Sequence, residues 1–264
     1  MSRIRSAAVA GLFYPADAAQ LHSEIQAMLA AAEQSTAAPK ALIVPHAGYI
    51  YSGPIAASAF AQLRGISDRI ERVVLLGPCH RVPLRGLATS SADYFETPLG
   101  RIKIDREAID RITSLQQVEE FDLTHQQEHS LEVQLPFLQE VLDRFTLVPL
   151  VVGDASAEEV SEVLEQLWGG DETLIVISSD LSHYHDYNTA RAMDSETCEA
   201  IEALEPAAIH YDQACGRNPV TGLLLAARKH GLQATTLDLR NSGDTAGDKS
   251  SVVGYGAWAF NHAE

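Results

Sequence analysis

Leu174-Ile-Val-Ile177 is a continuous apolar run, and the polar segment Ser178-Ser-Asp-Leu-Ser-His183 follows it directly. Two earlier parts of the chain repeat this pattern. Ala41-Leu-Ile-Val44 leads into Pro45-His46, and Arg72-Val-Val-Leu-Leu76 leads into Gly77-Pro-Cys-His80. Short apolar runs of this length predict buried strands of the kind found in parallel sheets that helices cover on both faces.

Helical patterns separate these strands. Residues 17–32 place Leu21, Ile25 and Leu29 on one face, which is typical of an amphipathic helix. Residues 130–145 repeat leucine at helical spacing, but Pro136 predicts that this helix starts late or kinks. Further helices are expected at 55–63, 107–115, 156–168, 189–204 and 220–230, and further strands at 86–90, 100–104, 146–152, 235–239 and 251–260. The alternation predicts an α/β fold, with residues 1–264 forming one domain.

Composition excludes several classes of function. The 264 residues include 36 acidic and 19 basic ones, for a net charge of −17. Such a surface repels phosphate backbones and anionic lipid, so we expect neither nucleic acid nor membrane as a partner. The N-terminus lacks the apolar core of a signal peptide, and the apolar runs are too short to span a bilayer. Three cysteines (Cys79, Cys198 and Cys215) without CxxC spacing fit a reducing compartment, so we expect a cytoplasmic protein.

The histidines after the three strands predict a shared site. One histidine after a strand usually satisfies only a turn hydrogen bond. Three repetitions favour convergence, because ligands of open α/β sheets bind outside the carboxyl ends of the strands. If the strands are parallel neighbours, His46, His80 and the pair Asp180 and His183 meet in one crevice.

Two polar segments could complete that site. His125-Gln-Gln-Glu-His129 places two histidines four residues apart, which would share a helix face if both were helical; otherwise they are solvated loop residues. Residues 241–248 form a polar loop in which Asp244 or Asp248 either reaches the crevice or merely connects two strands. Two imidazoles and one carboxylate suit non-haem Fe(II), although a zinc hydrolase could use the same set.

Several segments together resemble the Memo family, which is similar in fold to the class III extradiol dioxygenases of the LigB type. The matching segments are Ala10-Gly-Leu-Phe-Tyr-Pro15, Pro45-His-Ala-Gly-Tyr-Ile-Tyr-Ser-Gly53, Leu76-Gly-Pro-Cys-His80, Glu128-His-Ser-Leu-Glu-Val-Gln-Leu-Pro136, Ser178-Ser-Asp-Leu-Ser-His183 and Ser250-Ser-Val252. They span nearly the whole chain. The resemblance implies a layered α/β/α domain with a central mixed sheet and a metal-binding crevice.

The resemblance also implies roles for individual residues. His46 and His80 would be metal ligands, Asp180 and His183 would lie beside the metal, and His129 would line the pocket. Counting back from Ser250 with no gap places Asp244 where animal members carry a cysteine ligand, with Asp248 as the alternative. A carboxylate in place of a thiolate would shift the metal preference from copper toward iron.

Our hypothesis from the sequence is an Fe(II) site that activates O₂ on a phenolic or catechol-like substrate. His46, His80 and Asp244 would hold the metal, with Zn or Cu as alternative ions. His183 would be the general base and later the acid, and His129 would stabilise charge on bound oxygen. Asp180 would fix the tautomer of a neighbouring imidazole.

Two alternatives remain open, a zinc-dependent hydrolase and a non-catalytic metal-binding module that recognises a protein partner. Individual residues also have open roles. Tyr14, Tyr49 and Tyr51 either line the substrate side of the crevice or belong to the core. Cys79 is either a small buried residue or a redox-sensitive thiol.

Overall fold

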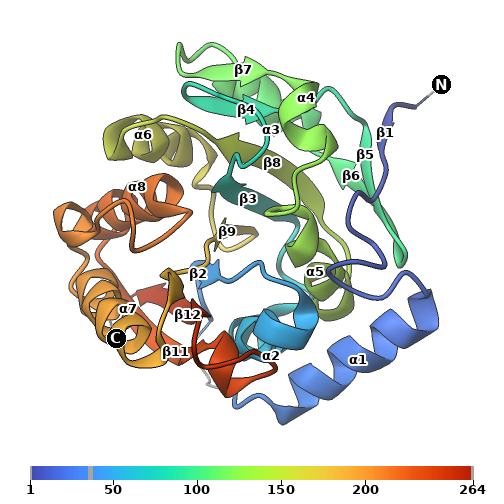
Figure 1. Cartoon of the computed structure of the whole chain (residues 1–264). Helices are drawn as coiled ribbons and strands as arrows, with labels where there is room; N and C mark the ends of the chain where they lie inside the picture. Colours follow the sequence, from blue (N-terminus) through green and yellow to red (C-terminus); the bar gives the residue numbers. More distant parts are fainter. Residues whose placement is uncertain (1, 35–37, 263–264) are drawn as a thin grey trace.

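The structure is a computed structural model that describes residues 2–34 and 38–262. A mixed sheet of 12 strands runs through its centre, in the order β1-β5-β6-β8-β3-β9-β2-β12-β10, with β4, β7 and β11 beside this path (Figure 1). The strands are β1 (Ile4–Arg5), β2 (Ala41–Val44), β3 (Arg72–Pro78), β4 (Leu87–Thr89), β5 (Tyr94–Thr97), β6 (Gly100–Ile104), β7 (Val118–Glu120), β8 (Thr146–Val152), β9 (Thr173–Ser178), β10 (His183–His185), β11 (Leu232–Asn241) and β12 (Val252–His262).

The four central strands are parallel, so the condition for convergence of His46 and His80 is met. β8, β3, β9 and β2 run in one direction, with Leu76 of β3 opposite Ile177 of β9 and Val44 of β2 opposite Ser178. The carboxyl ends of β2, β3 and β9 therefore lie side by side. β12 joins β2 in the antiparallel sense, which makes the sheet mixed.

Helices cover both faces of the sheet and confirm the layered α/β/α class. Figure 1 shows α1 (Ala18–Ala31), α2 (Tyr49–Phe60) and α5 (Leu135–Val141) on one side, and α6 (Ala157–Leu167), α7 (Tyr187–Glu202) and α8 (Arg217–Lys229) on the other. The shorter elements are α3 (Arg106–Ile112), α4 (Asp122–Gln126), η1 (Ala61–Ile66), η2 (Glu132–Gln134), η3 (Pro206–Ala208) and η4 (Ser242–Asp244).

Local sequence signals explain where several helices begin. Asp17 caps α1 by accepting the backbone N–H of Gln20, and Ser156 forms a capping box with Glu159 at α6. The helix expected at residues 130–145 starts only at Leu135, because Pro136 suits the first turn of a helix and not its interior. The structure thus settles the choice between a late start and a kink.

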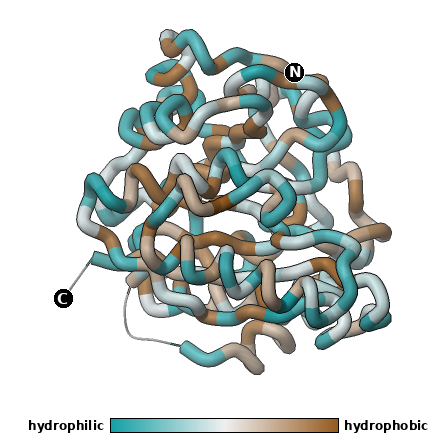
Figure 2. Tube along the Cα trace, turned by 60° about the vertical axis from the view of Figure 1, so that its left-hand side comes forward, coloured by the Kyte–Doolittle hydropathy of each residue, from teal (hydrophilic) through white to brown (hydrophobic). Residues whose placement is uncertain are grey.

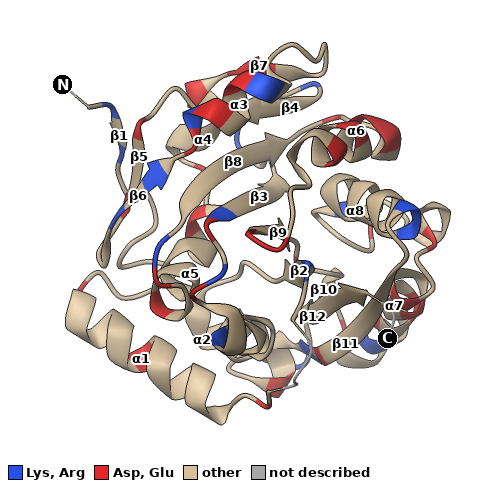
Figure 3. Cartoon of the chain, turned by 180° about the vertical axis from the view of Figure 1, so that it is seen from behind, with Lys and Arg blue, Asp and Glu red and all other residues tan. Residues whose placement is uncertain are grey.

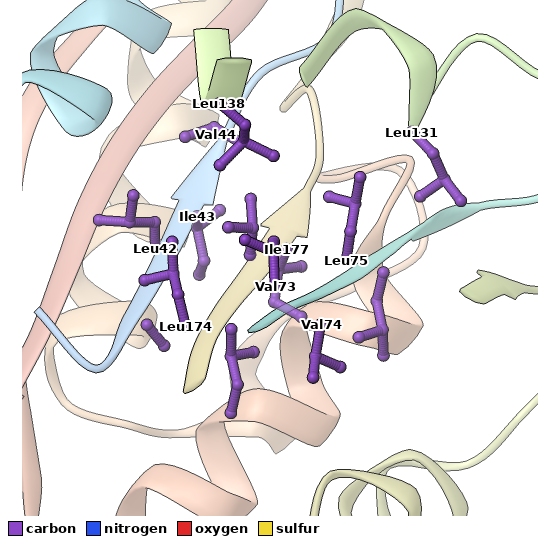
Figure 4. Close-up of a cluster of buried hydrophobic side chains, with 14 of the residues drawn as sticks. Leu42, Ile43, Val44, Val73, Val74, Leu75, Leu131, Leu138, Leu174 and Ile177 are labelled. Atoms are coloured by element: carbon purple, nitrogen blue, oxygen red, sulfur yellow. The ribbon is translucent and has the colours of Figure 1, made fainter. Parts of the chain in front are cut away.

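The core lies between the sheet and its helices. Leu42, Ile43, Leu75, Leu174 and Ile177 are fully buried, and Figure 4 shows them packed around the central strands. Full burial of each aliphatic side chain contributes roughly 1.5–3 kcal/mol, so these strands anchor the fold. Figure 2 shows hydrophobic stretches running through the interior of the trace.

The outer helices carry much of the negative charge. Figure 3 shows acidic residues along α3, α6 and α7, which accords with the net charge of −17. Within residues 2–34 and 38–262, no helix has both the length and the apolar character needed to cross a bilayer.

Candidate metal centre

Three imidazoles meet at the carboxyl ends of the central strands. His46 follows β2 and His80 follows β3, and the centroids of their rings lie 5.3 Å apart. His129, from the segment between α4 and η2, stacks on His80 at 4.7 Å and meets His46 edge-on at 5.4 Å. The structure therefore brings together His46 and His80, which the sequence analysis expected to converge, with His129 from the separate polar segment.

A thiol completes the group of candidate ligands. Sγ of Cys215, which lies just before α8, is 3.3 Å from Nε2 of His46. The ligand atoms of His46, His80 and Cys215 all lie within 4.8 Å of one another. Zinc lies about 2.3 Å from a thiolate sulfur and about 2.0–2.1 Å from an imidazole nitrogen. The 3.3 Å between Sγ of Cys215 and Nε2 of His46 fits two ligands of one such ion, and His80 is the third member of the group.

Asp244 is not brought to this centre, which corrects the expected ligand set. One oxygen of its exposed carboxylate accepts a hydrogen bond from the Tyr187 hydroxyl at 2.6 Å, and the other accepts the backbone N–H of Asn241 at 3.1 Å. The alternative, Asp248, is also exposed and accepts the backbone N–H of Ser250. Among the described residues, Cys215 rather than Asp244 lies with His46 and His80.

A second group does contain two imidazoles and a carboxylate, namely His80, Glu128 and His129. The Glu128 carboxylate accepts two hydrogen bonds from His80, one from the backbone N–H at 2.6 Å and one from Nδ1 at 2.9 Å. It also accepts the backbone N–H groups of His129 and Ser130, at 2.9 and 3.0 Å. Its oxygens are thus already engaged, so Glu128 is better suited to hold the histidines than to bind an ion directly.

Hydrogen bonding determines which nitrogen of His80 faces the centre. An ionised carboxylate only accepts hydrogen bonds, so Nδ1 of His80 carries the proton that it shares with Glu128. Burial of Glu128 opposes its ionisation, but the hydrogen bonds from His80 and Ser130 outweigh burial and lower its pKa to about 2. Nε2 of His80 is left with its lone pair available to a metal.

Ser178 orients His46 in the same way. The Ser178 hydroxyl donates its single proton to the Ser130 carbonyl at 2.7 Å and accepts a hydrogen bond from the Gln134 side chain. It lies 2.8 Å from Nδ1 of His46, so this nitrogen must be the donor. Nε2 of His46 is therefore unprotonated and directed at Cys215. Such supporting contacts are typical of metal-ligating histidines.

His183 and Asp180 lie beside the centre but differ in their contacts. Nδ1 of His183 is 2.7 Å from the Leu181 carbonyl, which can only accept, so Nε2 of this imidazole is unprotonated. Asp180 accepts the backbone N–H of His46 at 2.7 Å. It therefore positions the main chain of His46, whereas the expected control of imidazole tautomers comes from Ser178 and Glu128.

Burial sets the protonation of the centre. Burial lowers the pKa of His129 to about 4 and also lowers the pKa values of His46 and His183. These imidazoles are therefore neutral near pH 7, the form that binds metals. Burial raises the pKa of Asp180 to about 7 and raises the pKa of the Cys215 thiol. A bound cation would favour the thiolate at Cys215.

Other residues from the sequence analysis lie outside the group of candidate ligands. His125 ends up in α4, where Nε2 is 3.0 Å from the Ala88 carbonyl; α4 ends before His129, so the two histidines do not share a helix face. The hydroxyl of Tyr14 donates a hydrogen bond to the Glu132 carboxylate, and that of Tyr49 donates one to the Val133 carbonyl. Both tyrosines are buried, whereas Tyr51 is 39% exposed. Cys79 is half-buried, and its thiol donates to the Val82 carbonyl.

Sequence reasoning missed three residues that form or support the centre, namely Cys215, Glu128 and Ser178. Cys215 precedes Gly216 and an expected helix, but only the packing of that helix shows that the thiol faces the histidines. Glu128 stands beside His129, and Ser178 directly follows the predicted strand 174–177, but the sequence did not show the partners of either residue.

Fold and site together define an α/β protein with a histidine- and cysteine-lined candidate metal centre. A family model described as Memo-like protein matches residues 5–259, and the chain belongs to this family. A MEMO1 family protein of Aquifex aeolicus is 37% identical, with 96% of this chain and 97% of the relative covered. A MEMO1 family protein of Ignicoccus hospitalis is 38% identical, with 97% and 98% covered.

One solved structure resembles the fold. The crystal structure of an uncharacterized protein from Escherichia coli matches with a TM-score of 0.51 at 12% sequence identity. The match covers 81% of this chain and 98% of the other. At this identity the likeness concerns the fold alone.

Proposed function

We propose that this protein binds one transition-metal ion through Nε2 of His46, Nε2 of His80 and Sγ of Cys215, and uses it to act on a small phenolic or catechol-like molecule. The 3.3 Å distance between Nε2 of His46 and Sγ of Cys215 carries the proposal. The Nδ1 atoms of both histidines already have partners, Ser178 and Glu128, so their Nε2 atoms are free to bind.

The ligand set favours borderline and soft ions. A thiolate with two imidazoles suits Zn(II) and copper, whereas the preference for Fe(II) rested on a carboxylate that Asp244 does not supply. Fe(II) stays a candidate through the imidazoles, with Glu128 as the carboxylate of the second group. Metal content of protein purified without chelators decides between these ions.

The surrounding side chains support proton transfer from a substrate hydroxyl. A bound cation would stabilise the ionised form of that hydroxyl. His183 is suited to receive the proton, because its Nδ1–H is held by the Leu181 carbonyl and its Nε2 is unprotonated. His129, which is neutral near pH 7, lies against both His46 and His80 and would stabilise the charge on the ionised substrate oxygen.

The first experiment tests the ligands by Co(II) titration, in which a cobalt–thiolate pair has its own absorption band. Cys215→Ser should abolish that band and weaken Co(II) binding by at least roughly 100-fold, while Asp244→Ala should bind like wild type. Cys198→Ser is the matched control. Cys198 is half-buried like Cys215, but its thiol is hydrogen-bonded to the Thr236 hydroxyl. An unchanged band in Cys215→Ser contradicts the proposal.

A second experiment tests the reaction. Protein loaded anaerobically with Fe(II), Cu or Zn is supplied with O₂ and catechol, and oxygen uptake is recorded. Uptake that falls in His183→Gln supports an oxygen-dependent oxidoreductase with His183 as base. A filled site without uptake removes that reaction. Hydrolytic turnover with zinc would then favour the hydrolase, because zinc sites accept cysteine and histidine ligands together. A filled but inactive site would favour a module that recognises a protein partner.

A further inference from the structure

A β-bulge includes His183, the candidate base. In the antiparallel pair of β10 and β12, His183 is opposite Val253 and His185 is opposite Val252, so Tyr184 is the extra residue. Its φ of 61° lies in the left-handed region, which normally favours glycine or asparagine. Among the described residues, Leu204 is the only other non-glycine residue with positive φ.

Burial of the Tyr184 ring does not compensate for this strain. The side chain is 78% exposed, and its described ring contact is the edge-on approach to His183 at 5.7 Å between centroids. A strained backbone that holds an exposed aromatic ring beside a candidate base is unfavourable for the fold alone. Bulges and strained residues gather at functional sites, where they redirect a side chain toward a ligand.

Two more tyrosines lie in the same region. Tyr51, in the first turn of α2, is partly exposed, and Tyr255 of β12 is buried. Burial raises the pKa of Tyr255, and the charges of Asp180, Tyr51 and Tyr184 raise it further. Tyr184 contacts the ring of His183 and follows closely in the chain on Asp180, the residue that holds the main chain of His46.

We propose that Tyr184 is a specificity-determining residue whose ring packs against the aromatic ring of a ligand bound at the centre. This inference rests on the proposed function, because it assumes a phenolic ligand with its hydroxyl directed at His183 and the metal. Tyr184 directly follows His183 in the chain, and the bulge lies at this point. One short segment would therefore contact both the hydroxyl and the ring of the ligand. The ligand class is a flat aromatic molecule with at least one hydroxyl group.

The test uses 4-nitrocatechol as the probe, whose absorption changes when its hydroxyl ionises, with metal-free and Co(II)-loaded protein. Tyr184→Asn removes the ring and suits the left-handed backbone, so it should weaken binding roughly 3–10-fold without lowering the melting temperature. Tyr184→Gly should behave in the same way. Tyr184→Phe keeps the ring and should bind within about twofold of wild type.

The controls separate the two proposals. Leu204→Asn relaxes the other left-handed residue, at the end of α7 and outside the centre, and should leave probe binding unchanged. Equal affinity of wild type and Tyr184→Asn, or no probe binding by wild type that has taken up Co(II), overturns the inference while the metal site stands. Failure of Co(II) binding overturns the proposed function and is seen in the titration before any probe is added.

Discussion

Glu128→Gln should show how strongly the supporting carboxylate holds the centre. In the folded protein the pKa of Glu128 is about 2, against 4.5 for a free glutamate. Each unit of difference corresponds to about 1.36 kcal/mol, so the ionised group contributes roughly 3 kcal/mol to folding. Because the folded pKa is the lower one, this contribution is present above pH 4.5 and is lost as the pH falls toward 2.

At pH 7 the variant should therefore lose up to about 3 kcal/mol of unfolding free energy, since an amide nitrogen would face either the backbone N–H or Nδ1–H of His80. Co(II) affinity should fall roughly 10–100-fold, because His80 loses its orienting partner. Urea unfolding followed by circular dichroism measures the first value, and titration measures the second. Glu24→Gln, an exposed glutamate on α1, is the control. A loss below about 0.5 kcal/mol with wild-type Co(II) affinity would refute the reasoning.

Three further predictions concern the supports of the fold. Arg5→Met removes the partner of the buried Glu132 carboxylate and should cost about 3–5 kcal/mol in urea unfolding; a smaller loss than for an exposed arginine would contradict this. Burial lowers the pKa of His125 to about 4, whereas the unfolded value is 6.5. Folding stability is therefore full above pH 6.5 and declines toward pH 4, because the unfolded chain binds the proton more readily. His125→Gln should accordingly lose less stability than wild type between pH 7 and pH 5, and parallel losses would disprove it. Gly86→Ala should lower the melting temperature, because φ is +80° and an added Cβ would lie 2.3 Å from the Gln117 carbonyl oxygen; an unchanged value would be the contrary result.

The central strands were predictable because burial on both faces leaves a continuous apolar run. The predicted strands 41–44 and 146–152 have the same bounds in the structure, and so does strand 100–104, which lies outside the central four and is less buried. Edge strands such as β1 and β10 have two or three residues and no such pattern, so they were not expected. The bulge at Tyr184 was hidden for the same reason.

The positions of His46 and His80 were predictable because each follows a buried strand in a short turn that contains proline or glycine. The thiol was not, because Cys215 approaches the centre from the loop before α8 and its position depends on how that loop packs on β9. Counting residues back from Ser250 instead selected Asp244, which lies in a different loop, tied to Tyr187. Distance along the chain carries no information on such a contact between separate elements.

β9 itself contributes none of the three candidate ligands, yet its end determines where two of them lie. Ser178, its last residue, orients the imidazole of His46, and the next residue, Ser179, accepts the backbone N–H of Gly216 at 2.9 Å. A Cβ on Gly216 would lie 2.7 Å from the Ser178 carbonyl oxygen, so only glycine allows the loop before α8 to approach this closely. Cys215 therefore reaches His46 because a residue without a side chain follows it, and a shift of β9 would displace the imidazole and the thiol together.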